Sequence, residues 1–463
     1  MVGAGPGGYV AAFKAADLGM DLTLIDPDAN PGGTCLYRGC IPSKALLHVA
    51  RLLNEVREAE SWGVSFSKPK IDLGQLNAWK DRVVGKMAGG LTQLVDARGI
   101  HYVQGSARFL DSGNLRIDRM AGGVEDLAFD YGILATGSRP AAVPPLTIDN
   151  DRVLDSTGAL DLSDIPRTML VVGGGIVGLE LGTVYAALGT RVTVVEMLPG
   201  LIPAADRDLV RPLASRLKTA FERILLETRV VAASEVEKGI SVGFEDAAGK
   251  ASEATFEKIL VAAGRTPNSA DLGLENTRVE LDRHGYIQVD AQRRSAEPNI
   301  FAIGDVIGSG LAHTASHEGA LAVEVIAGHR AAFEPNAIPN VVYTDPEVAW
   351  CGLTEIEAEA EKRPVKVVRF PWAASGRATT LDRNEGMTKL LIDPGTERIL
   401  GVGIAGVGAG ELIAEGVLAV EMAALASDLK MSIHPHPTLS ETAMEAAELF
   451  YGAGTHLYVP GRD

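Results

Sequence analysis

The chain twice repeats one order of glycine, apolar and acidic positions. Residues 2–26 and 172–196 each begin with a glycine-rich turn, continue over a helix-length stretch, and finish with a short apolar strand closed by an acid. The acid is Asp26 in the first copy and Glu196 in the second. A tight turn, a helix and an apolar strand in this order are typical of a doubly wound α/β sheet, so we expect two such units.

The spacing of the glycines predicts what these turns bind. Glycine lets the backbone approach a pyrophosphate at a helix N-terminus, and the closing acid accepts hydrogen bonds from ribose hydroxyls. One such turn is weak evidence, but two copies that agree in register predict two dinucleotide sites. The predicted contacts are Gly3, Gly5 and Gly8 in the first copy, and Gly173, Gly175, Ile176, Val177 and Gly178 in the second.

Glu196 also indicates which nicotinamide cofactor binds. A carboxylate at this position hydrogen-bonds a free ribose 2′-hydroxyl and repels a 2′-phosphate, and no arginine cluster follows it. The sequence therefore favours NAD over NADP.

The first copy lacks most of its first strand. Only Met1 and Val2 precede Gly3, although this strand is central in a doubly wound sheet. The pattern suggests an N-terminal truncation or a misplaced start.

Composition narrows the function classes. The chain of 463 residues suits about three or four domains. A net charge of −17 argues against nucleic-acid or anionic-membrane partners, and no apolar run approaches the length of a membrane span. With three cysteines and no targeting segment, we expect a cytoplasmic protein, or a mitochondrial-matrix protein in a eukaryote.

Two of the cysteines form a candidate redox pair. Cys35 and Cys40 follow a Gly-Gly pair, and on a regular helix their Cα atoms would be about 8–9 Å apart, beyond disulfide reach. A bridge therefore needs a distorted or just-starting helix. The alternative is that both are buried, inert thiols. A zinc site would need a second ligand pair, which the sequence lacks, so no metal is expected. Cys351 is expected in the core.

A histidine segment near the C-terminus is the candidate base. His434 and His436 are each followed by proline, and an imidazole near neutrality can take a thiol proton. A loop histidine is the alternative. Glu441 is either the partner of a histidine or part of a capping box that starts at Thr438, before the apolar-periodic residues 443–450.

At GGTCLYRGCIPSK, residues 32–44, the chain resembles the redox signature of the flavin-dependent disulfide reductases. Other matching segments make the whole chain similar to the dihydrolipoamide dehydrogenase family. They include GAGPGGYVAA, ATGSRP, VVGGGIVGLELG, VAAGRTPN, IFAIGDV, TDPEVAWCGLTE and HPHPTLSE.

The resemblance implies an architecture. We expect an α/β protein with Rossmann-like FAD-binding (1–143) and NAD-binding (144–269) domains. A central segment (270–338) completes the FAD site, and a C-terminal α+β dimerisation domain (339–463) follows. Strand-like VVYT and KVVRF and helical GVLAVEMAALA fit this last domain.

The resemblance also implies residue roles. Asp26 and Asp305 would bind the FAD ribose and ribitol, Lys44 would lie at the reactive flavin edge paired with Glu180, and His436 with Glu441 would act from the opposite subunit of a homodimer. Ala107 and Ala312 would be backbone contacts to FAD, and Val230 and Gly264 would line the NAD site.

The implied reaction is oxidation of dihydrolipoamide through Cys35 and Cys40, with reduction of NAD. The implied partner is a lipoyl-bearing acyltransferase of a 2-oxoacid dehydrogenase complex, or the glycine cleavage system. There are three alternatives. A glutathione-type reductase is disfavoured by Glu196, and a mercuric reductase would need a C-terminal cysteine pair. The third is a nonenzymatic flavoprotein.

One departure from the family lies inside the redox signature. Tyr37 and Arg38 stand where relatives usually have Asn-Val. Arg38 either points inward, where it would depress a thiol pKa, or points to solvent.

Overall fold

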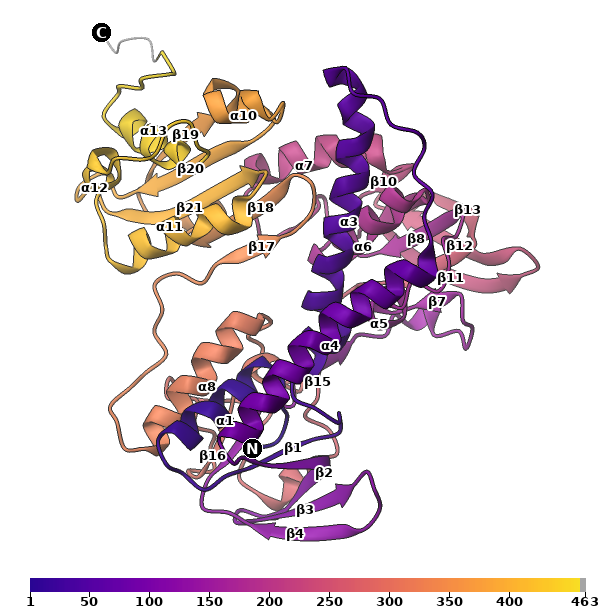
Figure 1. Cartoon of the computed structure of the whole chain (residues 1–463), viewed down its shortest axis with the longest axis vertical. Coiled ribbons are helices and arrows are strands. Elements are labelled where there is room, and N and C mark those ends of the chain that lie inside the picture. The colour runs from indigo at the N-terminus through magenta and orange to yellow at the C-terminus, as the bar shows by residue number, and fades with distance from the viewer. Residues whose placement is uncertain (459–463) are drawn as a thin grey trace.

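The chain folds into three lobes that meet around α3 (Cys40–Glu58) and α6 (Ile176–Leu188), as the computed structural model shows (Figure 1). The structure describes residues 1–458. No helix within that range is long and apolar enough to cross a membrane.

The first lobe combines strands that are distant in sequence. β1 (Thr23–Asp26) pairs in parallel with β2 (His101–Asp111), and β5 (Gly132–Leu134) pairs in parallel with β16 (Ile300–Ala302). The segment after residue 270 thus returns to the lobe that begins the chain. An antiparallel ribbon extends β2 through β3 (Asn114–Arg119) and β4 (Val124–Ala128).

A single residue joins the two halves of this sheet. Val2 forms parallel bridges with Ile25 on one side and Leu134 on the other. Its N–H donates to the Ile133 carbonyl at 2.9 Å, and its own carbonyl accepts from Ala135 at 2.7 Å. The first strand, expected to be short, consists of this one paired residue.

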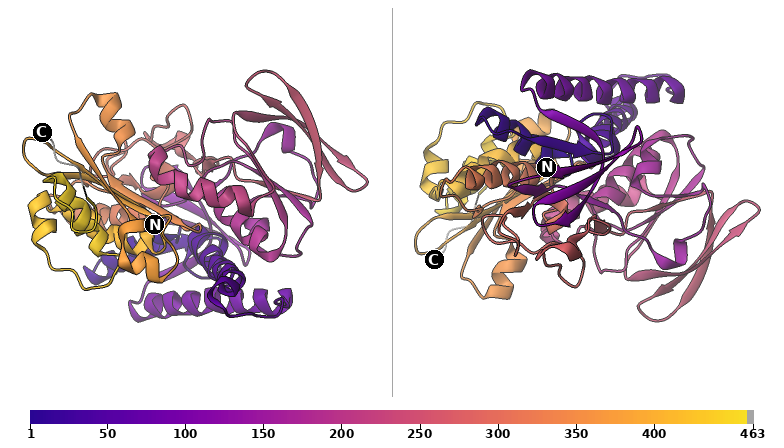
Figure 2. Two further views of the ribbon diagram at one scale, coloured as in Figure 1. Left: turned by 90° about the horizontal axis from the view of Figure 1, so that it is seen from above. Right: turned by 90° about the horizontal axis from the view of Figure 1, so that it is seen from below.

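Small residues let the helices of this lobe pack closely. α1 (Pro6–Asp17) lies against α8 (Ala312–Ile326), where a side chain on Gly319 would collide with the Gly7 carbonyl. Figure 2 shows α4 (Leu73–Ala97), the longest helix of the described residues, on the surface along one edge of the molecule. The other helical segments here are α2 (Gly33–Arg38), η1 (Ala59–Trp62), η3 (Leu274–Asn276) and η4 (Gly304–Ile307).

The second lobe contains a five-stranded parallel sheet in the order β10-β9-β8-β14-β7. The apolar runs of β8 (Thr168–Val172), β9 (Arg191–Val195) and β14 (Lys258–Val261) are almost wholly buried, as expected for parallel strands covered on both faces. The remaining elements are β7 (Val153–Leu154), β10 (Arg223–Leu225), α5 (Ser156–Leu160), α7 (Arg207–Ala220), η2 (Pro144–Leu146), and the antiparallel strands β11 (Thr228–Val236), β12 (Gly239–Asp246) and β13 (Ala251–Phe256). Strands β6 (Ser138–Pro140) and β15 (Arg265–Pro267) pair between this lobe and the first.

The third lobe is a five-stranded antiparallel sheet in the order β17-β18-β21-β20-β19, with its own buried core. The predicted strands at VVYT and KVVRF overlap β17 (Asn340–Val342) and β19 (Lys366–Pro371), and the predicted helix GVLAVEMAALA is helical in its first six residues, at the end of α11 (Ala409–Glu421). The other elements are β18 (Glu347–Gly352), β20 (Met387–Ile392), β21 (Ile399–Gly406), α9 (Glu355–Glu361), η5 (Trp372–Ala374), α10 (Gly376–Thr380), α12 (Ala426–Met431) and α13 (Glu441–Phe450).

Candidate active site

The two glycine-rich turns have the same backbone geometry. Gly3 has φ +100° and Gly173 has φ +111°, values that favour glycine. A Cβ on Gly3 would collide with the Ala135 carbonyl, and one on Gly173 would collide with the Ala262 carbonyl. Each turn therefore needs glycine to pass close to the end of a neighbouring strand.

The closing acids are also held in the same way. Each carboxylate accepts one N–H from the residue after the first glycine of its turn and one from the residue two positions beyond the acid. The distances are 2.6 and 2.9 Å at Asp26, and 2.7 and 2.8 Å at Glu196. Burial raises the pKa of Asp26, although the two N–H donors oppose this. Both carboxylates retain lone pairs that can accept from ribose hydroxyls.

The residues at the two turns fit dinucleotides. Neither α1 nor α6 has a side-chain cap at its amino end, and a Cβ on Gly5 or Gly175 would meet no atom within 4 Å. Free N–H groups at a helix N-terminus beside open space can bind a pyrophosphate. Ile176 and Val177 begin α6, and Gly8 and Gly178 each pack against the first glycine of their own turn.

The cysteine pair lies at a break between two helices. Cys35 is in α2, Cys40 begins α3, and Gly39 between them has φ −151° and ψ −113°. A Cβ on Gly39 would lie 2.9 Å from the Thr34 carbonyl oxygen, so glycine allows the chain to fold back here. The structure thus has the just-starting helix that a bridge between these cysteines requires.

The two thiols differ in acidity. Both are free and partly buried, and they share a hydrogen bond. That bond lowers the pKa of Cys40 to about 7, with a further lowering from the Lys44 ammonium, although burial and Glu180 oppose it. The same bond, with burial, raises the pKa of Cys35. Burial raises the pKa of Cys351 to about 12, in keeping with its expected place in the core.

A cation lies next to the cysteine pair and is bound by a buried acid. Lys44 Nζ is 2.7 Å from Glu180 Oε2, and the Glu180 side chain is 4% exposed. The other Glu180 oxygen accepts the N–H of Tyr343 at 3.0 Å, and the Lys44 ammonium lies 4.6 Å from the centre of the Tyr343 ring. Lys44 and Glu180, paired by the resemblance, are therefore in contact, while Tyr343 was missed because none of the motifs singled it out for a role.

Arg38 does not point toward the cysteines. Its guanidinium binds Asp28 through two hydrogen bonds, of 3.0 and 2.6 Å. Of the two orientations considered from the sequence, the inward one is wrong, and the guanidinium is partly exposed to solvent but held by Asp28. The Tyr37 hydroxyl is used locally, on the carbonyls of Asn30 and Pro31.

Asp305 belongs to a polar cluster between the first two lobes. It accepts the Ser138 hydroxyl at 2.5 Å, and Arg265 Nε lies 2.6 Å from the same hydroxyl and 3.6 Å from Asp305. Ser138 and Arg265 lie in segments used for the resemblance, yet their contact with Asp305 could not be predicted from one sequence. The other proposed contacts are dispersed: Ala312 begins α8, Ala107 is buried in β2, Val230 lies in β11 and Gly264 precedes β15.

His436 and Glu441 form a pair on the third lobe. His436 Nδ1 is 2.9 Å from Glu441 Oε1, and the imidazole is 71% exposed. Glu441 Oε2 accepts the Thr438 N–H at 2.7 Å. The expected capping box is thus only half formed, because the Thr438 hydroxyl donates to the Pro435 carbonyl and α13 begins at Glu441 itself.

The His436–Glu441 pair and the cysteine pair are not in contact within one chain. No hydrogen bond or ion pair in residues 1–458 links His436 to Cys35 or Cys40, and α13 and the start of α3 lie in different lobes (Figure 1). His434 is bound separately, with Nε2 2.7 Å from Glu415 Oε1. The structure of one chain therefore does not bring the His436–Glu441 pair and the cysteine pair into contact.

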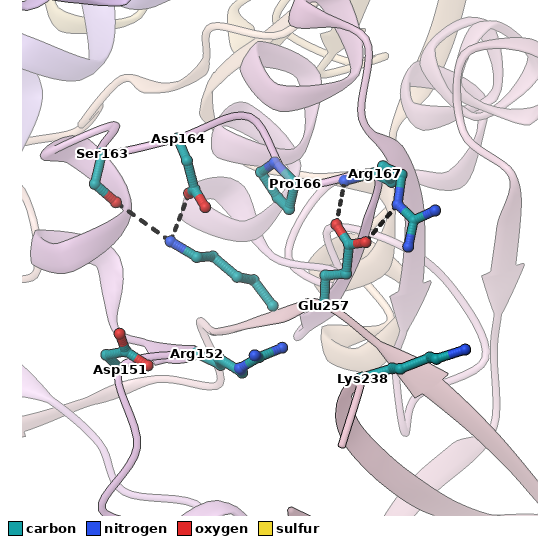
Figure 3. Close-up of a pocket in the computed structure, with 9 residues that line it drawn as sticks. Asp151, Arg152, Ser163, Asp164, Pro166, Arg167, Lys238 and Glu257 are labelled. Carbon is teal, nitrogen blue, oxygen red and sulfur yellow. Dashed lines mark hydrogen bonds and ion pairs between the residues drawn. The ribbon is translucent and has the colours of Figure 1, made fainter. Parts of the chain in front are cut away.

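Two other polar sites lie away from the nucleotide turns and the cysteine pair. A cavity of about 690 Å³ lies at the amino ends of β7, β8 and β14, opposite the nucleotide turn, where Lys258 contacts Asp164 and Glu257 contacts Arg167 (Figure 3). Near α7 and α9, three carboxylates surround the buried Lys389 ammonium at 2.6–2.8 Å. They are Asp206, Asp208 and Glu355.

Comparison with known proteins gives the family. The model of the pyridine nucleotide-disulphide oxidoreductase family matches residues 1–319, and the model of its dimerisation domain matches residues 338–447. The chain therefore belongs to the pyridine nucleotide-disulphide oxidoreductases. This membership confirms the predicted fold class, the dimerisation domain and the use of FAD and NAD as cofactors.

Relatives cover nearly the whole chain. Dihydrolipoyl dehydrogenase from Vibrio cholerae is 45% identical over 458 residues, which are 99% of this chain and 96% of the relative. Dihydrolipoyl dehydrogenase from Haemophilus influenzae is 46% identical over 460 residues, 99% of this chain and 95% of the relative. Among solved structures, LpdA from Mycobacterium tuberculosis has a TM-score of 0.90 at 27% identity, covering 97% of this chain and 98% of its own. RclA from Escherichia coli, an HOCl-induced flavoprotein disulfide reductase, has a TM-score of 0.86 at 26% identity with the same coverage.

Proposed function

We propose that this protein oxidises dihydrolipoyl groups to lipoyl groups and reduces NAD to NADH, as a dihydrolipoyl dehydrogenase. The observation that carries the proposal is the cysteine pair at the α2–α3 break, where Cys40 is acidic and Cys35 is hydrogen-bonded to it. The names of relatives at 45–46% identity support this substrate, and Glu196 supports NAD.

The residues of the chain would carry the thiol chemistry as follows. With Cys35 and Cys40 joined as a disulfide, His436 of a second copy takes a proton from one substrate thiol. The resulting thiolate attacks Cys35, which breaks the Cys35–Cys40 bond and leaves Cys40 as a thiolate. The second substrate thiol then displaces Cys35, closing the lipoyl disulfide, and the proton held by His436 returns to Cys35. Two electrons and one proton have moved to the cysteine pair, and the proton of the second substrate thiol is released.

The chain would hold FAD beside the reduced cysteines, where it would supply the redox chemistry that accepts their electron pair and the Cys35 proton and delivers them to NAD as hydride. The chain holds these cofactors through the two glycine-rich turns and their acids. We propose the remaining contacts as inferred from the resemblance: Asp305, Lys44, Ala107 and Ala312 toward FAD, and Glu180, Val230 and Gly264 on the nicotinamide side.

Glu441 is suited to hold the base. Its one oxygen contacts His436 Nδ1 while the other is fixed by Thr438, so the free Nε2 faces outward from the lobe. Burial raises the pKa of Glu441, but the hydrogen bonds from Thr438 and His436 more than offset this and leave its pKa lowered. An ionised Glu441 stabilises the imidazolium that forms when the thiol proton is taken.

The dimerisation domain supports a homodimer, with His436 reaching the cysteine pair of the other copy. We further propose that the electron donor is a lipoyl group on the acyltransferase of a 2-oxoacid dehydrogenase complex, or on the glycine cleavage system. The compartment proposed is the cytoplasm, or the mitochondrial matrix in a eukaryote.

The test is NADH formation from NAD and dihydrolipoamide by the FAD-supplemented protein, with NADP in parallel. We expect NAD-dependent turnover that is abolished in Cys40→Ser, while that variant still binds flavin. Lipoamide turnover retained by Cys40→Ser, or no turnover by flavin-loaded wild type, would refute the proposal.

A further inference from the structure

The ion pair beside Cys40 and the residue that contacts both of its members come from all three lobes. Lys44 comes from α3 in the first lobe and Glu180 from α6 in the second. Tyr343 follows β17 directly in the third lobe. The ion pair is therefore closed by a residue of the dimerisation domain rather than by the nucleotide-binding lobes alone.

Tyr343 contacts both members of the ion pair. Its N–H donates to Glu180 Oε1 at 3.0 Å, which leaves Glu180 Oε2 to accept Lys44 at 2.7 Å. Its ring centre lies 4.6 Å from Lys44 Nζ, within the range of a cation–π contact. One residue thus fixes the rotation of the carboxylate and limits the movement of the ammonium.

The position of Lys44 matters because the two members of the ion pair have opposite effects on the pKa of Cys40. The Lys44 ammonium favours the Cys40 thiolate, and the Glu180 carboxylate disfavours it. A third of the Lys44 side chain is exposed, so a looser lysine would move into solvent, where water screens its charge. The titratable groups that face Cys40 are Cys35, Lys44, Glu180, Tyr9 and Tyr343.

We propose that Tyr343 is a positioning residue of the redox centre, whose ring and N–H hold the Lys44–Glu180 pair in place beside Cys40. The inference rests on the proposed function, because it takes Cys40 as the reactive thiolate. It assigns to the third lobe a role in the redox centre besides that of the dimer contact and the base.

The test measures how fast Cys40 of the reduced protein reacts with iodoacetamide across a pH series, by peptide mass spectrometry. Removing the aromatic ring in Tyr343→Leu or Tyr343→Gln should shift the midpoint upward by about 0.3 pH unit or more, because a Lys44 ammonium that moves into solvent favours the Cys40 thiolate less. Tyr343→Phe keeps the ring and the backbone N–H and should match wild type. Cys351, buried and of high pKa, should stay unmodified throughout and reports folding.

A double-mutant cycle separates positioning from general structure. In a Lys44→Met background, Tyr343→Leu should cause no further shift, because Tyr343 acts on Cys40 through Lys44. An unchanged midpoint in both Tyr343→Leu and Tyr343→Gln, an equal shift in Tyr343→Phe, or a shift that persists without Lys44 would each overturn the inference. The readout needs no lipoyl substrate, so a failure of the proposed activity would show separately, as absent NADH formation by wild type.

Discussion

At the scale of single residues, the acidity of Cys40 is the feature on which the proposed thiol chemistry depends. Its largest cause is a hydrogen bond from Cys35, so the effect exists only when both cysteines are reduced. Because the folded pKa of Cys40, about 7, lies below the ordinary thiol pKa of 9.0, the ionised Cys40 contributes its full stabilisation of the reduced fold above pH 9.0. The contribution falls as the pH decreases and is lost below about 7.

The matched variants Cys35→Ala and Cys35→Ser test this cause. Alanine removes the donor, so the alkylation midpoint of Cys40 should rise by about one pH unit or more, since a hydrogen bond to a charged group contributes about 1.5–3 kcal/mol. Serine keeps a donor and should restore most of the shift. A midpoint near 7 in the alanine variant would show that Cys35 does not set the acidity.

Glu196 should decide the choice between NAD and NADP. Replacing it by glutamine removes the charge that repels a 2′-phosphate, so the ratio of kcat/KM for NAD to that for NADP should fall about tenfold, equal to about 1.4 kcal/mol. Steady-state kinetics with both cofactors measure this ratio. Asp26→Asn, at the equivalent position of the other turn, is the control and should leave the ratio unchanged in FAD-supplemented protein; a fall of the same size there would contradict the assignment.

At the scale of elements, the Lys389 cluster connects the second and third lobes. The wholly buried ammonium contacts carboxylates at the amino end of α7 and on α9, and Asp206 also accepts two N–H groups at the start of α9. Hydrogen bonds from Lys389 and Arg369 hold the pKa of Asp208 below its usual range, although burial opposes them. Stability from this carboxylate is therefore present above its unfolded pKa and is lost as the pH falls toward the folded one.

Lys389→Met should destabilise the protein by about 3–5 kcal/mol, because it leaves buried carboxylates without their cation. Denaturant unfolding at neutral pH measures the loss. Arg369→Met is the matched control, since Arg369 binds two of the same carboxylates, Asp208 and Glu355, but is 39% exposed and should cost about 1 kcal/mol or less. Equal losses in the two variants would contradict the assignment of the cluster to Lys389.

Much of this fold could be predicted from the sequence, because the glycine-rich turns impose local geometry that a repeat makes visible. The two turns, the two acids and the strands near 340 and 366 lie where the pattern placed them. The division at residues 143, 269 and 338 stays a prediction. The capping box was wrong in its half at Thr438, because α13 begins at Glu441 with Ser440 at the N-cap position, so the Thr438 hydroxyl does not cap the helix and donates to the Pro435 carbonyl.

The candidate site was less predictable, since its contacts join residues that are distant in sequence. Lys44 and Glu180 are separated by 136 positions, and Tyr343 lies 163 positions beyond Glu180. The resemblance supplied the first pair, but nothing in a tyrosine before Thr-Asp-Pro indicates a contact with a lysine. The direction of the Arg38 side chain was left open, because its partner, Asp28, lies ten positions away in the chain and the sequence does not show that the two are in contact.

At the scale of the whole molecule, one chain contains all the residues proposed for the reaction, but the cysteine pair and His436 lie in different parts of it. The cysteine pair lies at the junction of the lobes, and the exposed His436 lies on the third lobe. The proposed reaction therefore requires a dimer, in which a two-fold axis would give each cysteine pair the His436 of the other copy.

Mixed dimers test this requirement. Cys40→Ser and His436→Gln should each be inactive alone, and mixing them with subunit exchange should restore about a quarter of wild-type NADH formation, because half of the dimers then have one intact site. An affinity tag on one of the two variants confirms that exchange has occurred, because capture of the tagged subunit then also retains the untagged one. No recovery in exchanged dimers would place His436 and the cysteines of one site in the same subunit.

The central claim is that electrons pass from a dihydrolipoyl group to NAD through Cys35 and Cys40. The most direct measurement adds one equivalent of dihydrolipoamide per subunit to the oxidised, FAD-loaded protein, traps thiols by alkylation before and after adding NAD, and counts them by mass spectrometry. We predict that Cys35 and Cys40 become alkylated with release of lipoamide, and that NAD then removes both thiols as one equivalent of NADH forms. NADH formed while Cys35 and Cys40 stay unmodified at every stage would contradict the account.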